Sequence, residues 1–204
     1  MKKIIYAFLV LAFVACHNKE VLLPQVDKTI VATVENHSPI YMFFEINGKD
    51  TLVNLNRNNS ISSTNWIFNI DKRLPIKIVI PEIIKMQTKK ESSMHKSETS
   101  ENYFSYSDSI HKKLAFVSFT NVIFKIEKPK KGINILFSKN KILVDSIPFN
   151  QEKFNKFIKN QSVTVLNNYN LCFEKNVSYD DFINNFVFLQ SLEINKNKMY
   201  IYVY

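Results

Sequence analysis

Short apolar runs separated by polar turns recur along most of the chain, and their spacing alternates between that of strands and that of helices. β-Branched and aromatic runs of strand length occupy 38–46 and 50–55, and the Asn-Gly pair at 47–48 between them is a strong hairpin signal. Apolar residues at helical spacing fill 81–90, where Pro81 either begins the helix or kinks it. This pattern predicts a protein that mixes strands and helices.

The second half of the chain repeats this alternation more regularly. Its predicted elements are strands at 133–137 and 142–144, a helix at 149–158, a strand at 163–173, a helix that begins after Ser178, and a strand at 199–204. Ser178 is a typical helix N-cap, and the two aspartates that follow Tyr179 suit the positive end of the helix dipole. The predicted order is therefore strand, strand, helix, strand, helix, strand.

The two halves are related by an internal offset of 103 residues. At this offset, residues 68–76 align with 171–179, so that the acid-lysine pair at 71–72 falls on the pair at 174–175. The apolar positions of the two following helices also coincide. Chance similarity between two amphipathic units is the alternative, but the offset favours two pseudo-repeats.

Composition divides the chain into units. We expect an N-terminal α+β unit at 29–127 with a polar insert near 91–113, and a C-terminal α+β unit at 133–204. Residues 128–132 hold both Pro and Gly among charged residues and are the best candidate for a linker. The predicted fold class is α+β, with two small mixed strand-helix units.

The first 15 residues have the pattern of a signal peptide. Lys2 and Lys3 precede a 12-residue apolar run, which is too short to cross a membrane and has the length of a signal-peptide core. The segment at 11–16 resembles a bacterial lipobox, with Phe13 where Leu is usual. The resemblance implies cleavage before Cys16 and its lipidation, followed by a tether at 16–28. Ordinary secretion and an uncleaved anchor are the alternatives.

Charge and composition exclude several functions. The net charge is +9, but of the 27 basic residues only Arg57 and Arg73 are arginine. Because arginine is the main reader of base edges and phosphates, we expect no nucleic-acid partner. The lysines are interpreted as a solvated surface, with anionic lipid headgroups as the alternative. Two glycines in 204 residues exclude glycine-rich phosphate and dinucleotide loops.

No catalytic, cofactor or metal site is predicted, and lipidation at Cys16 is the only site assignment. Cys172 is interpreted as a small buried hydrophobe. Asp71, beside Lys72 and Arg73, is a weak candidate that local electrostatics explains equally well. The histidines are interpreted as exposed loop residues, with a weak metal or pH role as the alternative; they are His17, His37, His95 and His111.

Residues 133–204 resemble the periplasmic domain of the ExbD/TolR biopolymer-transport family. The matching features are the hairpin segment at 140–145 and the segment at 173–179 that enters the last helix. The resemblance implies a fold and an envelope context. Members of that family also carry a transmembrane helix with a proton-conducting Asp, which this sequence lacks, so no proton coupling is implied. The whole chain also resembles lipoproteins of Gram-negative envelopes.

These observations lead to three hypotheses on function. The first is a non-enzymatic envelope protein, anchored to a membrane on its periplasmic or outer face, that binds or scaffolds a protein partner, through a sheet edge or in a transport complex. The second is a surface module for a glycan or small ligand, which predicts an exposed aromatic cluster in a groove. The third is a hydrolase, which predicts a pocket where an acid meets a His or a second acid. A homodimer is left open.

Overall fold

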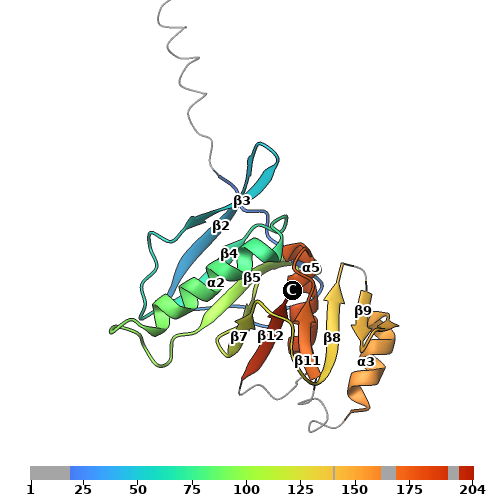
Figure 1. Ribbon diagram of the computed structural model, residues 1–204. Coiled ribbons are helices and arrows are strands. Elements are labelled where there is room, and N and C mark those ends of the chain that lie inside the picture. Colours follow the sequence, from blue (N-terminus) through green and yellow to red (C-terminus); the bar gives the residue numbers. More distant parts are fainter. Residues whose placement is uncertain (1–18, 140, 162–168, 193–197) are drawn as a thin grey trace, which may run out of the picture.

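The structure is a computed structural model that describes residues 19–139, 141–161, 169–192 and 198–204 (Figure 1). The first sheet and its helix contain β1 (Gln25–Val26), β2 (His37–Asn47), β3 (Asp50–Asn56), β4 (Asn65–Ile70), α2 (Ile76–Glu91), β5 (Asn102–Asp108) and β6 (Lys113–Ser118). The second sheet and its helices contain β7 (Val122–Lys125), β8 (Ile133–Ser138), β9 (Lys141–Val144), β10 (Ile147–Phe149), α3 (Gln151–Lys159), β11 (Tyr169–Phe173), α5 (Tyr179–Ser191) and β12 (Met199–Val203). The predicted α+β class is confirmed.

The two sheets share one topology. The first has the order β3-β2-β4-β5 and the second the order β9-β8-β11-β12. In both, the first two strands form an antiparallel hairpin and the next two are parallel to the inner hairpin strand. The predicted order of the C-terminal unit is confirmed, with the short strand β10 in addition. Of the strand expected at 163–173, residues 163–168 lie outside the described residues.

Reciprocal backbone hydrogen bonds join the two halves where their helices begin. The Ile76 N–H donates to the carbonyl of Val177 at 3.0 Å, and the Tyr179 N–H donates to the carbonyl of Leu74 at 2.7 Å. The two bonds are equivalent under the offset of 103: Ile76 and Tyr179 are the first residues of α2 and α5, and Leu74 and Val177 occupy matching positions before them. The Lys77 N–H to Lys175 and Asp180 N–H to Lys72 bonds, at 2.9 and 3.1 Å, form a second such pair. The repeat is therefore an approximate two-fold relation in space.

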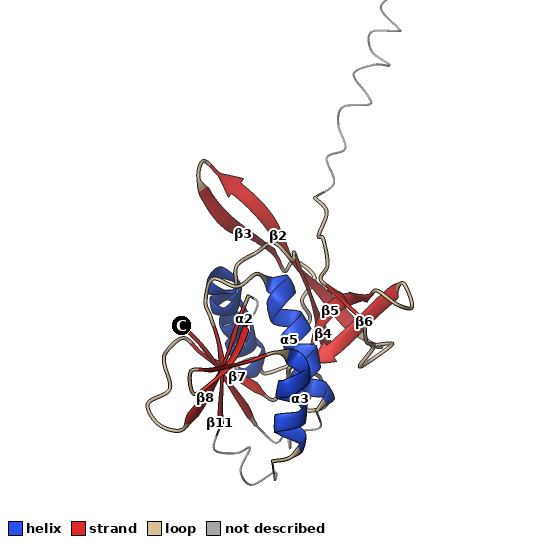
Figure 2. Ribbon diagram, turned by 90° about the vertical axis from the view of Figure 1, so that its right-hand side faces the viewer, coloured by secondary structure: helices blue, strands red, loops and turns tan. Residues whose placement is uncertain are grey.

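One hydrophobic core serves both sheets and the helices α2, α3 and α5. Aromatic rings connect the halves: Phe104 of β5 stacks on Phe119 with ring centroids 3.8 Å apart, and its ring also meets the edges of Phe182 and Phe186 of α5. Trp66 is 1% exposed, as expected for a core residue. Because the core is continuous, the two units are packed as one body (Figure 2).

Two expected boundaries differ from the structure. The expected polar insert at 91–113 contains β5, which lies between β4 and β6 in the first sheet. Its many hydroxyl residues made it resemble a polar loop, although Phe104 and Tyr106 are buried. The linker at 128–132 is a loop, but it connects β7 to β8, two strands of the second sheet. The sheets therefore divide between β6 and β7, ahead of the expected linker.

Candidate functional site: an amide-lined groove

A polar groove lies between α3, α5 and the segment around β1, and we call it the amide groove. Its main part has a volume of about 670 Å³. A smaller part of about 310 Å³ continues along β8 and β9, and the two parts share Gln151, Asn184 and Asn185. The main part is lined by Gln25, Val26, Asp27, Lys28, Ser109, Gln151, Asn155, Asn184, Asn185, Val187, Phe188 and Ser191.

Helix α3 supplies one wall of the groove. Asn150 caps this helix, because its side-chain oxygen accepts a hydrogen bond from the Lys153 N–H at 2.8 Å. The helix buries Phe154 and Ile158 against the core. Gln151 and Asn155, which are one helical turn apart, line the groove.

Helix α5 supplies the floor. The predicted N-cap is confirmed, since the Ser178 hydroxyl accepts a hydrogen bond from the Asp181 N–H at 3.1 Å. Asn184 and Asn185 each donate one amide hydrogen to a carbonyl of the preceding turn, at 2.9 and 2.8 Å. Their side-chain oxygens have no hydrogen bond within the described residues. These two amides are therefore held in place while part of their hydrogen-bonding capacity remains open to the groove.

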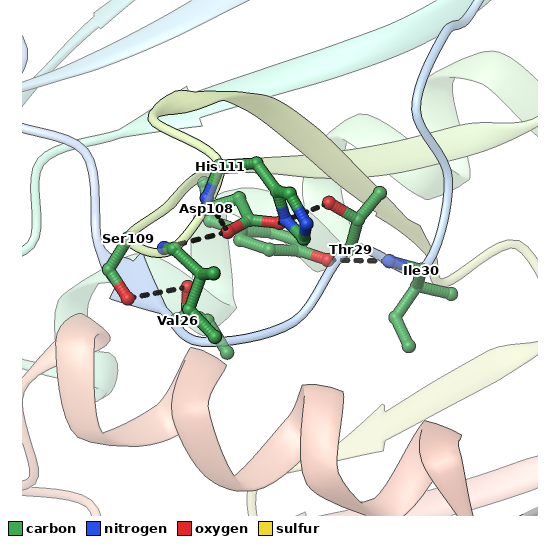
Figure 3. A network of polar contacts seen from close by, with 8 residues as sticks. Val26, Thr29, Ile30, Asp108, Ser109 and His111 are labelled. Carbon is green, nitrogen blue, oxygen red and sulfur yellow. Dashed lines mark hydrogen bonds and ion pairs between the residues drawn. The ribbon is translucent and has the colours of Figure 1, made fainter.

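The third wall is fixed by a network around the buried carboxylate of Asp108, at the end of β5 (Figure 3). One oxygen accepts the N–H groups of Ile110 and His111, at 2.9 and 2.8 Å. The other accepts the Thr29 hydroxyl and is 2.8 Å from Nδ1 of His111. These bonds to the charged form, chiefly the one from Thr29, keep the pKa of Asp108 well below its usual range.

The same network places β1 against β5. The Ser109 N–H donates to the carbonyl of Val26 at 2.8 Å, and the Ser109 hydroxyl donates to the same carbonyl at 3.2 Å. The Ile30 N–H donates to the phenolic oxygen of Tyr106 at 2.9 Å. Figure 3 shows these bonds on both sides of the loop that passes over α5. The wall that contains Gln25 to Lys28 is thus held at both ends.

Asp108 and His111 form the acid-histidine pair that a hydrolase would need. His111 lies in a turn and is exposed, as expected from the sequence. The histidine side chain is 61% exposed, and no hydroxyl in the described residues bonds to its second ring nitrogen. The carboxylate also accepts two backbone N–H groups of its own turn. A carboxylate bonded in this way stabilises a turn. The hydroxyl beside the pair in the described residues, that of Thr29, donates to Asp108, so the histidine does not activate it as a nucleophile.

Asp71 holds the segment before β1 against the rest of the protein through hydrogen bonds. Its buried carboxylate accepts two guanidinium hydrogen bonds from Arg73 at 2.8 Å, and the N–H of Leu22 at 3.2 Å. Burial alone would raise the pKa of Asp71, but these hydrogen bonds outweigh it and lower the pKa. The Arg73 guanidinium also lies 4.3 Å above the ring of Phe44. The acid-base pair is therefore structural, and its role is to position residues before β1.

The other candidate residues named from the sequence, the cysteines and the remaining histidines, do not form a site within the described residues. Cys172 is buried, and burial raises the pKa of its thiol to about 11, as expected for a small core residue. His37 contacts the carbonyl of Val34 and His95 is exposed. Cys16 and His17 lie outside the described residues. Within the described ranges, no three His, Cys, Asp or Glu side chains gather as metal ligands.

Sequence reasoning did not predict the amide groove, because asparagine and glutamine side chains form no recognisable sequence motif. One signal was available: Asn184-Asn185 lies in the middle of a predicted helix, although Asn is a poor helix former. No family model, curated protein or solved structure matches the chain. None of the helices in the described ranges is both long and apolar enough to cross a membrane.

Proposed function

We propose that this chain is a membrane-anchored, non-enzymatic binding protein of the bacterial envelope, and that the amide groove is its binding site. The observation that carries the proposal is the open hydrogen-bonding capacity of amides that the fold holds in place. The groove has the volume of a small-ligand site, roughly 300–1,000 Å³. Preorganised polar groups are what a binding site requires, since little order is lost when a ligand arrives.

The anchor is supported by how the chain joins the body. Only two residues lie between Cys16 and Lys19, whose ammonium is 3.6 Å from the Glu45 carboxylate on β2. The three steps along the chain from Cys16 to Lys19 span at most about 10 Å when extended. A lipid on Cys16 would therefore hold the projecting β2–β3 hairpin close to the bilayer (Figure 2). The hydrogen bond from the Leu22 N–H to Asp71 holds the next part of this segment against the protein.

The envelope context is also supported by the resemblance of residues 133–204 to the ExbD/TolR periplasmic domain. The strands and helices follow the order that this resemblance implies. A link to an envelope transport complex is therefore part of the proposal. Proton coupling is not part of it, because the resemblance covers only residues 133–204.

A second candidate function is capture of a protein partner by strand addition. Within the described residues β3 pairs with β2 only, so its other edge is open. Leu52 on this strand is 42% exposed. An open edge with exposed apolar side chains is a template for an added strand.

The anchor is tested on native protein and a Cys16→Ser variant by intact mass and membrane fractionation. We expect an acylated, membrane-bound native protein and a soluble variant. A native protein without lipid would refute the anchored half of the proposal.

The binding half is tested with a photocrosslinking amino acid at Asn155 in the groove and, as control, at the exposed Lys85 of α2. Crosslinks in intact cells are identified by mass spectrometry. We expect a defined adduct at Asn155 and none at Lys85. Equal labelling at both positions would show that the groove has no ligand of its own. A third variant carries the same amino acid at Leu52, and an adduct at that position alone would favour strand addition.

A further inference from the structure

We infer that the amide groove takes an uncharged oligosaccharide. This inference rests on the proposed function and names the class of ligand. The argument depends on the main part of the groove: on its hydrogen-bonding capacity, on its charge, on its one aromatic side chain and on the rigidity of its walls.

The polar groups match sugar hydroxyls. A side-chain amide both donates and accepts hydrogen bonds, and so does each hydroxyl of a sugar. Asn184 and Asn185 present their oxygens from a rigid helix, and Gln151 and Asn155 face them from α3. No side-chain hydrogen bond of Gln151 or Asn155 forms within the described residues. A chain of hydroxyls can therefore bond to both sides of the groove.

The charge of the main part favours a neutral ligand. Although the whole chain has a net charge of +9, the main part has one acidic and one basic side chain, Asp27 and Lys28. An anion site would be expected to concentrate arginine or lysine donors. The two opposite charges at one end leave the amides as the dominant groups of the main part, and the smaller part adds Lys139, Lys141 and Asp181.

Phe188 supplies the apolar surface that the C–H face of a sugar ring needs. Its ring is partly exposed in the groove and packs on Phe154, with ring centroids 5.9 Å apart. This contact fixes the orientation of the ring. The expected exposed aromatic cluster is absent from the described lining of the main part, where Phe188 is the only aromatic residue. The ligand is thus recognised mainly through its hydroxyls.

A peptide fits the groove less well. Peptide sites usually offer a sheet edge for backbone pairing or deep pockets for apolar anchors. Nine of the twelve residues that line the main part are polar, and its apolar members are Val26, Val187 and Phe188. Within the lining, β1 pairs with β5 for only two residues. The geometry offers side-chain amides instead of a backbone ladder.

The test uses the full-length chain in detergent on an array of uncharged N-acetylglucosamine and mannose oligosaccharides, anionic heparin fragments and uncharged peptides. Calorimetric titration of the best uncharged saccharide then compares Asn184→Ala, Asn155→Ala and the control Asn121→Ala. Asn121 is exposed in the turn before β7 and does not line the groove. Circular dichroism checks that each variant is folded.

We expect the affinity for the saccharide to fall at least tenfold in both groove variants and to stay unchanged in the control. No saccharide binding, equal affinity in all variants, or binding of heparin or peptides alone would overturn the inference. A defined adduct at Asn155 without saccharide binding would leave the proposed function standing and remove only the oligosaccharide. No adduct and no saccharide binding would remove both.

Discussion

Lys90 is a buried cation whose removal gives a sharp test of the packing between α2 and β5. Only 1% of this residue is exposed. Its ammonium donates to the carbonyl of Glu101 at 2.9 Å and to the side-chain oxygen of Asn102 at 3.1 Å, and it lies 5.1 Å from the ring centroid of Trp66. Burial, with help from the nearby charge of Lys96, lowers the pKa of Lys90 from 10.5 to about 8.

This pKa makes the free energy of unfolding depend on pH. Between about pH 8 and 10.5 the unfolded chain keeps the Lys90 proton that the folded chain has lost, so the folded state gains stability as the pH rises. The full shift corresponds to about 3 kcal/mol. We expect about 2 kcal/mol, because solvent screens part of the interaction with surrounding charges. Below pH 8 this gain is absent.

The assay compares native protein with Lys90→Met by urea unfolding, followed by circular dichroism, between about pH 7 and 10. Methionine keeps the apolar stem and removes the titrating group. The stability difference, native minus variant, should rise with pH through this window. Lys89→Met, at an exposed neighbouring position, should give a flat difference. A flat difference for Lys90→Met as well would show that water reaches the ammonium and would refute the reasoning.

Three further predictions concern the last unit of the chain. Ser178→Ala should lower the free energy of unfolding by about 1 kcal/mol, since the N-cap bond of α5 is lost; an unchanged urea midpoint would contradict this. Tyr179→Phe should raise stability by about 1 kcal/mol, because the buried Tyr179 hydroxyl has no hydrogen-bond partner within the described residues, and a lowered melting temperature would contradict it. Cys172 should resist iodoacetamide at neutral pH until urea unfolds the chain, since its thiol is buried and its pKa is raised to about 11; labelling of the native protein would show otherwise.

Elements bounded by characteristic turn or cap residues were predictable from the sequence. The hairpin of β2 and β3 was visible because Gly48 can adopt the positive φ of +61° that the first position of its two-residue turn needs. The turn between β9 and β10 uses Asp145 and Ser146, both with positive φ, and carries no glycine. Strand β10 was therefore missed. The helix α2 begins at Ile76, five residues before the predicted start at Pro81, and continues through that proline.

The site was much less predictable than the fold. The groove brings together residues near positions 25, 109, 155 and 185, and only the tertiary packing decides that they meet. The bond between Asp108 and Thr29 likewise spans 79 positions. Periodicity reports which face of one helix is buried, but it does not report which two exposed faces lie opposite each other.

The groove lies where the two halves of the repeat differ. Its floor, α5, has a counterpart in α2, but the wall that α3 supplies has none: α3 lies between β10 and β11, whereas the corresponding loop between β3 and β4 contains only turns. The segment β1 runs parallel to β5 as β7 runs parallel to β12, so this second wall does have a counterpart. The repeated parts supply the shared core and the reciprocal hydrogen bonds on which stability depends. Because Gln151 and Asn155 belong to the unrepeated part and lie outside the core, changes there should affect binding far more than folding.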